Sequence, residues 1–268
     1  MELGKRTLTA VILLAGVFAV IQYAPDIVFF LLLQVFVLGA LAEFYALAGR
    51  KKLRPQRALG VALAILFSVS FIVPRLTFET ALAAGFLLTC VYYVIAVSTL
   101  EKLATFTQSV AVTFFGALYL SFTLNFMFAI RQTYGAFYLY FLFAVIFLGD
   151  TGAFFIGKPF GRHKMTPVAS PNKSWEGSAG GILFACLGAW AARELLFPGL
   201  PMGKALLVAV LVHAAAQVSD PMESLFKRAV GVKDSSNLLP GHGGFFDRID
   251  SLILAAPLFY YLVRIVWK

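Results

Sequence analysis

The sequence predicts an all-α polytopic membrane protein. Of its 268 residues, 60% are hydrophobic and only 13% are charged, and a soluble domain of this length could not cover so much apolar surface. Many apolar runs approach the roughly 20 residues that one helix needs to cross a bilayer. The alternating segments of about 10 residues that are typical of a membrane β-barrel are absent.

Nine apolar runs are candidate transmembrane helices, and short polar or Pro/Gly breaks separate most of them. They cover approximately residues 7–23, 26–48, 58–74, 79–98, 104–130, 136–156, 178–197, 203–220 and 249–267. The first run follows a basic start, as a signal peptide does. Because no clear small-x-small cleavage site follows it, we expect an uncleaved span.

The basic residues predict the orientation of these spans. With the N-terminus in the cytoplasm, 16 of the 22 Lys and Arg residues fall in cytoplasmic segments, as the positive-inside rule requires. Nine spans then place the C-terminus on the opposite side. Orientation, together with attraction to anionic membrane lipids, accounts for the net charge of +9 without a nucleic-acid partner.

Two long polar stretches, about 157–177 and 221–248, are separated by two predicted spans. They must therefore face the same compartment, which the charge bias makes the cytoplasm. The other connections are too short to carry much chemistry. We therefore expect the functional surface in these two stretches and in the helix ends beside them.

The first stretch contains a candidate phosphate site within SPNKSWEG, residues 170–177. Ser170, Lys173 and the free N–H groups of a helix start could bind a phosphate. Alternatively, Ser174 only caps that helix and Lys173 only anchors it at the interface. Upstream, Asp150 lies late in an apolar run, where an ionised carboxylate costs several kcal/mol unless it is paired or metal-bound.

The second stretch suggests a metal site. Asp220 and Asp247 lie at its two ends, and Asp250 could share a helix face with Asp247 because the two are three residues apart. Oxygen ligands of this kind suit a hard cation such as Mg²⁺. Four bases lie nearby that suit phosphate oxygens: Lys227, Arg228, Lys233 and Arg248.

Acids for a metal beside bases for phosphates form the layout of a phosphoryl or nucleotidyl transferase. The alternative is a solvated loop with incidental ion pairs. His242, between two glycines, could contact a phosphate or nucleotide, or could simply hold the turn.

These residues resemble the signature of the phosphatidate cytidylyltransferases, also called CDP-diacylglycerol synthases. The resemblance covers about 27 residues, from Ser224-Leu-Phe-Lys-Arg through Lys233-Asp234 to Leu239-Pro-Gly-His-Gly-Gly-Phe-Phe-Asp-Arg-Ile-Asp250. Residues 150–177 resemble the family's other block, whereas the first 130 residues match only as hydrophobic spans. The resemblance implies that CTP and phosphatidic acid react, with Mg²⁺, to give CDP-diacylglycerol and pyrophosphate in phospholipid biosynthesis.

The resemblance also implies roles for individual residues. The metal is expected at Asp220, Asp247 and Asp250, with room for a second cation. The phosphates of CTP or lipid are expected at Lys173, Arg228 and Lys233, with supporting contacts from Ser170, Ser224 and His242. The expected catalytic residues are Asp220, Asp247, Asp250 and Lys233. Arg248 is left out of the substrate contacts because it could pair with an acid.

The chain is interpreted as one integrated membrane domain of a bacterial inner membrane, with the active site facing the cytoplasm. Residues 1–130 would form the N-terminal transmembrane helices and residues 131–268 the catalytic region. The oligomeric state is open, a homodimer included. Two other functions remain: a transporter or channel that uses the intramembrane acids as a pathway, and a different CTP-dependent lipid enzyme such as a polyprenol kinase.

Overall fold

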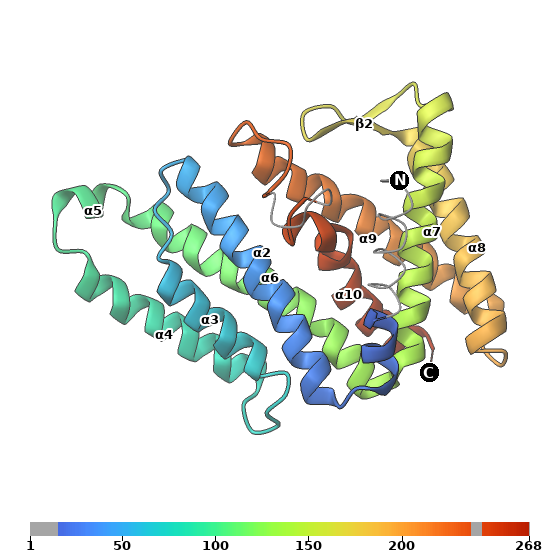
Figure 1. The fold of residues 1–268 in the computed structure, drawn as a ribbon, viewed down its shortest axis with the longest axis horizontal. Helices are drawn as coiled ribbons and strands as arrows, with labels where there is room; N and C mark the ends of the chain where they lie inside the picture. The colour runs from blue at the N-terminus through green and yellow to red at the C-terminus, as the bar shows by residue number, and fades with distance from the viewer. Residues whose placement is uncertain (1–15, 237–242, 268) are drawn as a thin grey trace, which may run out of the picture.

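The protein is a bundle of long apolar helices with one small hairpin at its end (Figure 1). The computed structural model describes residues 16–236 and 243–267, and seven helices in this part of the chain are long and apolar enough to cross a membrane. They are α2 (Asp26–Arg50), α4 (Phe78–Ala96), α6 (Phe106–Tyr134), α7 (Ala136–Phe160), α8 (Trp175–Leu196), α9 (Met202–Arg228) and α10 (Phe246–Val266). Two shorter helices are α3 (Arg57–Val69) and α5 (Leu100–Ala104).

The predicted helical membrane class is confirmed, and each predicted span from 26–48 onward coincides with a helix. The span predicted at 58–74 corresponds to α3, which has 13 residues and is shorter than a typical bilayer crossing of about 20. Most of the first predicted span lies outside the described residues, although residues 16–23 are helical. The count of nine spans and the side of each terminus therefore stay predictions.

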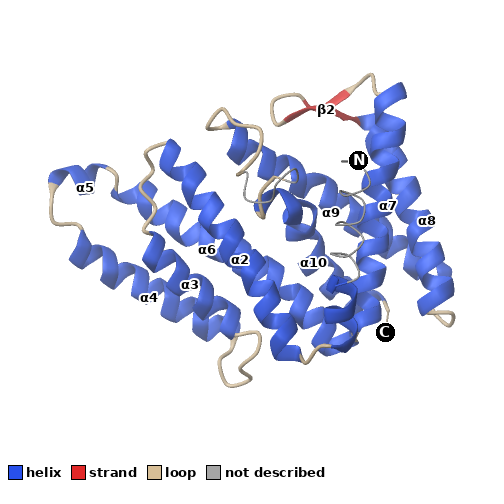
Figure 2. Cartoon of the chain, in the orientation of Figure 1, coloured by secondary structure: helices blue, strands red, loops and turns tan. Residues whose placement is uncertain are grey.

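Two segments that the sequence analysis treated as polar loops contain regular structure. Helix α9 continues through Asp220 to Arg228, so Asp220 lies inside the helix and not at its end. Pro221 lacks the N–H that would continue the helical ladder, which made an end at this point the natural prediction. Between α7 and α8 the chain forms an antiparallel hairpin, β1 (Lys164–Thr166) and β2 (Ser170–Ser174) (Figure 2).

The connections between helices alternate between the two ends of the bundle (Figure 1). The α2–α3 connection, the α5 region, the hairpin and the segment after α9 lie at one end. The α3–α4, α6–α7 and α8–α9 connections lie at the other. Both long polar stretches therefore share one end of the molecule, as their separation by two spans predicts.

Helices α7 and α8 approach each other closely because small residues line their interface. A Cβ atom on Gly188 of α8 would lie 2.7 Å from the backbone carbonyl oxygen of Ala144 in α7. At the start of α8, a Cβ on Gly180 would collide with the side chain of Ile156. Close approach of backbones at small residues is a common way for helices to associate in membranes. Here it keeps the end of α7 near the start of α8, and so brings together the two ends of the hairpin that connects them.

Gly188→Ala is expected to destabilise the protein by about 1–3 kcal/mol, as overpacking typically does, because the obstructing atom belongs to the backbone and cannot rotate away. Gly203→Ala in α9 is the matched control, since no atom lies within 4 Å of a Cβ there. Thermal unfolding of the detergent-solubilised protein measures both. Equal midpoints for the two variants would contradict the close packing of α7 and α8.

Candidate active site

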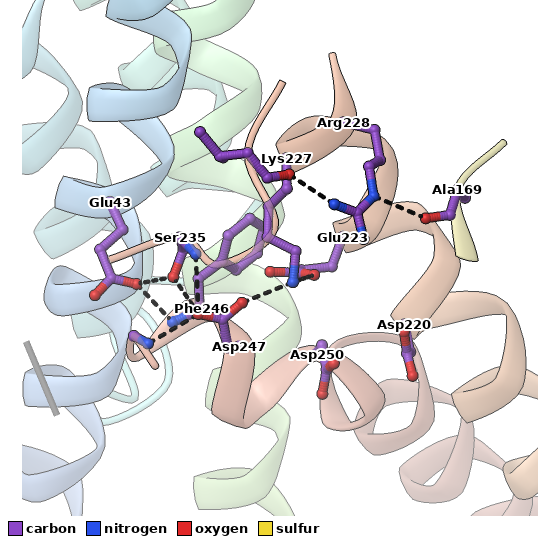
Figure 3. Close-up of polar contacts among 12 residues, drawn as sticks. Glu43, Ala169, Asp220, Glu223, Lys227, Arg228, Ser235, Phe246, Asp247 and Asp250 are labelled. Atoms are coloured by element: carbon purple, nitrogen blue, oxygen red, sulfur yellow. Dashed lines mark hydrogen bonds and ion pairs between the residues drawn. The ribbon is translucent and has the colours of Figure 1, made fainter. Parts of the chain in front are cut away.

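Asp247, in the first turn of α10, accepts four hydrogen bonds from the described residues (Figure 3). Its Oδ1 accepts from Lys227 Nζ at 2.6 Å. Its Oδ2 accepts from the backbone N–H groups of Ser235 and Gly244, at 3.0 and 2.8 Å, and from the Ser235 hydroxyl at 2.7 Å. A carboxylate in this turn also interacts favourably with the positive end of the helix dipole. Asp247 thus holds together the segment that leads into α10.

Lys227 lies between two carboxylates and is only 8% exposed. Its Nζ is 2.5 Å from Glu223 Oε2, one helical turn earlier on α9, and 2.6 Å from Asp247 Oδ1. Within the described residues, Glu223 has no ion-pair partner other than Lys227. Since Glu223 is fully buried, Lys227 is the charge that makes this pair of acids tolerable.

A second group of charged residues lies beside this cluster. Lys173 of β2 forms an ion pair with Asp220 of α9, with 2.7 Å between Nζ and Oδ2. The Ser251 hydroxyl is 3.3 Å from Asp150 Oδ2 and 3.2 Å from Asp250 Oδ1. Asp220 interacts electrostatically with both of these aspartates. The two polar stretches predicted to cooperate therefore do meet, through residues of α7, β2, α9 and α10.

The sequence left open whether Ser174 and Lys173 only cap and anchor α8, and the structure gives a different answer for each residue. The Ser174 hydroxyl accepts a hydrogen bond from the Gly177 N–H at 3.1 Å, so Ser174 is the N-cap of α8. Lys173, by contrast, turns toward Asp220. This pairing puts an ammonium group within the group of acids, where a substrate phosphate could compete for it.

The other predicted residues are placed as follows. Arg228 donates to the carbonyl oxygens of Ala169 and Val232, at 3.4 and 3.0 Å, and so joins the hairpin to the segment after α9. Ser224 is buried on α9, Ser170 begins β2, Lys233 is exposed, and His242 lies outside the described residues. Their substrate contacts stay predictions.

Glu43 of α2 is a neighbour of this site that the sequence analysis did not predict. It is 3% exposed, and it accepts hydrogen bonds from Ser235, from the N-cap residue Phe245 and from the first residue of α10, Phe246. The sequence could have indicated this residue, because Glu43 is an acid within an apolar run. The same energetic argument that singled out Asp150 applies to it.

The Mg²⁺ site expected from the sequence stays a prediction, and the described acids do not form a closed cage for a metal. Among the described residues, no group of three or more His, Cys, Asp or Glu side chains could hold a metal ion. Mg²⁺ commonly uses one or two carboxylates and fills its remaining positions with water and phosphate oxygens. Asp220 and Asp250 suit that arrangement. At Asp247, a metal would have to compete with the Lys227 contact.

Comparison with known protein families places the whole chain in one of them. The model of the cytidylyltransferase family matches residues 4–266, nearly the whole chain. The chain belongs to the cytidylyltransferase family. The resemblance seen in the acidic and basic motifs is thus confirmed, and the family match extends over the N-terminal helices, where the sequence motifs offered only hydrophobicity.

Several relatives within the cytidylyltransferase family are named phosphatidate cytidylyltransferase. The protein of Bacillus subtilis is 38% identical over 151 residues, which are 56% of each chain. That of Haemophilus influenzae is 42% identical over 132 residues, 48% of this chain and 46% of the relative. That of Staphylococcus epidermidis is 42% identical over 126 residues, 47% and 48%. The chain thus aligns with about half the length of the curated relatives it matches.

Lys227→Met is expected to destabilise the protein by about 3–5 kcal/mol, because Glu223 and Asp247 would lose the cation between them. The double variant Glu223→Gln/Lys227→Met is expected to recover part of this loss, since it also removes one of the two charges. Thermal or denaturant unfolding in detergent compares the three proteins. A double variant no more stable than Lys227→Met would argue against this charge balance.

Proposed function

We propose that the chain transfers the cytidylyl group of CTP to phosphatidic acid, giving CDP-diacylglycerol and pyrophosphate with Mg²⁺ as cofactor. The family match and the names of the relatives support this reaction. The observation that carries it is the convergence of Asp150, Lys173, Asp220 and Asp250 from four separate elements. Acids for a metal beside a base for phosphate are the groups that this chemistry needs.

In the proposed reaction a phosphate oxygen of the lipid attacks the α-phosphorus of CTP, and the bond from that phosphorus to the bridging oxygen of pyrophosphate breaks. The attacking oxygen is already anionic, so the main obstacle is repulsion between two polyanions. When bound, Mg²⁺ neutralises phosphate charge and aligns the reacting groups.

The protein's own groups supply the remaining charge. Lys173 would exchange its contact with Asp220 for a phosphate oxygen, and Arg228 and Lys233 would bind phosphates from the segment around the end of α9. Fixed cations of this kind stabilise the charge that develops on the leaving pyrophosphate. Ser170, Ser224 and His242 remain proposed supporting contacts.

We infer that this site faces the cytoplasm of a bacterial inner membrane. The relatives are bacterial proteins, and the polar segments at the hairpin end carry most of the basic residues. A site at the membrane interface would let cytosolic CTP meet a lipid head group without moving either substrate through the bilayer.

The purified protein, incubated with Mg²⁺, phosphatidic acid and CTP labelled at the α-phosphate, is expected to yield a labelled CDP-lipid. Asp247→Asn should lower this rate by at least about 100-fold, comparable to losing an essential electrostatic contact. Asp26→Asn is the control and should retain activity. Asp26 is the first residue of α2, far from the hairpin end of the bundle, and it pairs with Arg131. Full activity of Asp247→Asn would contradict the assigned role.

The same assay separates the alternative functions. Transfer of label from the γ-phosphate of CTP to a lipid alcohol would indicate a kinase. If well-folded protein forms neither lipid product, the result would favour transport.

Asp220→Asn and Asp250→Asn are each expected to raise the Mg²⁺ concentration needed for half-maximal activity by about tenfold or more, since each removes a charged ligand. Activity titrated against Mg²⁺ at saturating CTP measures the change. Unchanged Mg²⁺ dependence in both variants would remove these two residues from the proposed metal site.

A further inference from the structure

Glu43 contacts both ends of the segment that joins α9 to α10, although it lies about 200 residues earlier in the chain (Figure 3). Its Oε1 accepts from the Ser236 hydroxyl at 2.6 Å and from the Phe245 N–H at 3.0 Å. Its Oε2 accepts from the Ser235 hydroxyl at 2.8 Å and from the Phe246 N–H at 2.9 Å. Each carboxylate oxygen therefore has two donors among the residues that the structure describes, which offsets the cost of burying its charge.

These contacts supply a cap that α10 cannot provide for itself. The first N–H groups of any helix have no acceptor within the helix. At α10 the N-cap position is occupied by Phe245, whose side chain forms no capping hydrogen bond. Glu43 provides the acceptor from another helix, and its negative charge lies at the positive end of the α10 dipole.

The face of α2 around Glu43 is shaped to receive the same segment. The Phe36 and Phe245 rings pack edge to face, with centroids 5.5 Å apart, and the Phe44 and Phe246 rings do so at 6.1 Å. A Cβ on Gly39 would collide with the Phe245 ring, so this glycine provides the space for it. The aromatic contacts exclude water, which strengthens the hydrogen bonds to Glu43.

Glu43 is also joined to Asp247 through a single side chain. The Ser235 hydroxyl oxygen lies 2.8 Å from Glu43 Oε2 and 2.7 Å from Asp247 Oδ2. Since a hydroxyl has one proton, the two carboxylates share it. Gly244 lies against the same atoms, and a Cβ there would collide with both Ser235 and Glu43.

We propose that Glu43 is a positioning residue for the active site, and that α2 completes the site by fixing the start of α10. In this way the N-terminal helices set the orientation of Asp247 and Asp250, which lie in the first turns of α10. Glu43 acts through these residues and not on substrate. The inference depends on the proposed cytidylyl transfer only for its activity measurement.

Glu43→Gln tests the proposal because it keeps the size of the side chain but replaces one acceptor oxygen by an NH₂ group. Amide hydrogen exchange should rise about tenfold at residues 243–247, since a loss of about 1.4 kcal/mol in local stability multiplies the open population tenfold. The turnover rate should fall at least about tenfold with little change in KM for CTP, as expected when catalytic groups are misplaced.

Phe67→Leu is the matched control. Phe67 is fully buried on α3, and its ring packs against Phe78 of α4 and Phe114 of α6. It should lower the midpoint of thermal unfolding while leaving exchange at residues 243–247 as in wild type. If Glu43→Gln does not fold, Glu43→Asp carries the test. That variant keeps the charge on a shorter side chain, so exchange at 243–247 should still exceed that of wild type.

Wild-type exchange at residues 243–247 in the Glu43 variants would overturn the proposal. So would a loss of activity no larger than that of Phe67→Leu for the same loss of thermal stability. If exchange is faster in the Glu43 variants but the wild-type protein forms no CDP-lipid, the positioning role is retained and the proposed reaction is rejected.

Discussion

The structure depends on how the negative charges of buried and partly buried carboxylates are balanced in an apolar helix bundle. Lys227 lies between Glu223 and Asp247, and Lys173 pairs with Asp220. Within the described residues Glu43 has no such cation, and four hydrogen-bond donors surround it instead. An isolated charge in these surroundings would be too costly to keep, so each acid requires a partner. Glu223 finds it on its own helix, whereas Asp220, Asp247 and Glu43 find theirs on other elements. These pairings join elements that hydrophobic packing alone would leave free to slide.

This constraint also explains why the site is built across helices. Hydrophobic contacts between membrane helices are non-directional, and lipid tails compete for the same surfaces. Ion pairs and hydrogen bonds have defined geometry, so they select one register of α9 against α10. The Ser219 hydroxyl of α9 adds to this selection, because it donates to the Asp250 carbonyl and accepts from the Leu254 N–H. The same register brings the acids of α7, α9 and α10 together.

A site of this kind suits a reaction between two anions at a membrane surface. Lys173 and Lys227 are already paired with acids. A phosphate ligand at Lys173 would therefore replace an existing partner and would not meet an unpaired charge. The ion pairs lower the free-energy cost of holding these bases close together before substrate binds. When a phosphate replaces an acid as the partner, charge is rearranged close to the reacting atoms. Membership of the cytidylyltransferase family, together with relatives named phosphatidate cytidylyltransferase, agrees with such a design.

The sequence by itself determined the class of fold, because bilayer thickness imposes the length of apolar runs and these are visible in any window. It also identified the family, through acidic and basic residues that are conspicuous in a chain with so few charges. It did not predict the hairpin or the extension of α9 through Asp220, since polar segments have no hydrophobic period and Pro221 normally ends a helix. Only the tertiary structure decided which charges pair across elements, because those partners lie far apart in the chain. Glu43 shows this most clearly: its sequence position marks a costly acid, but its contact with the start of α10 exists only when α2 packs beside it.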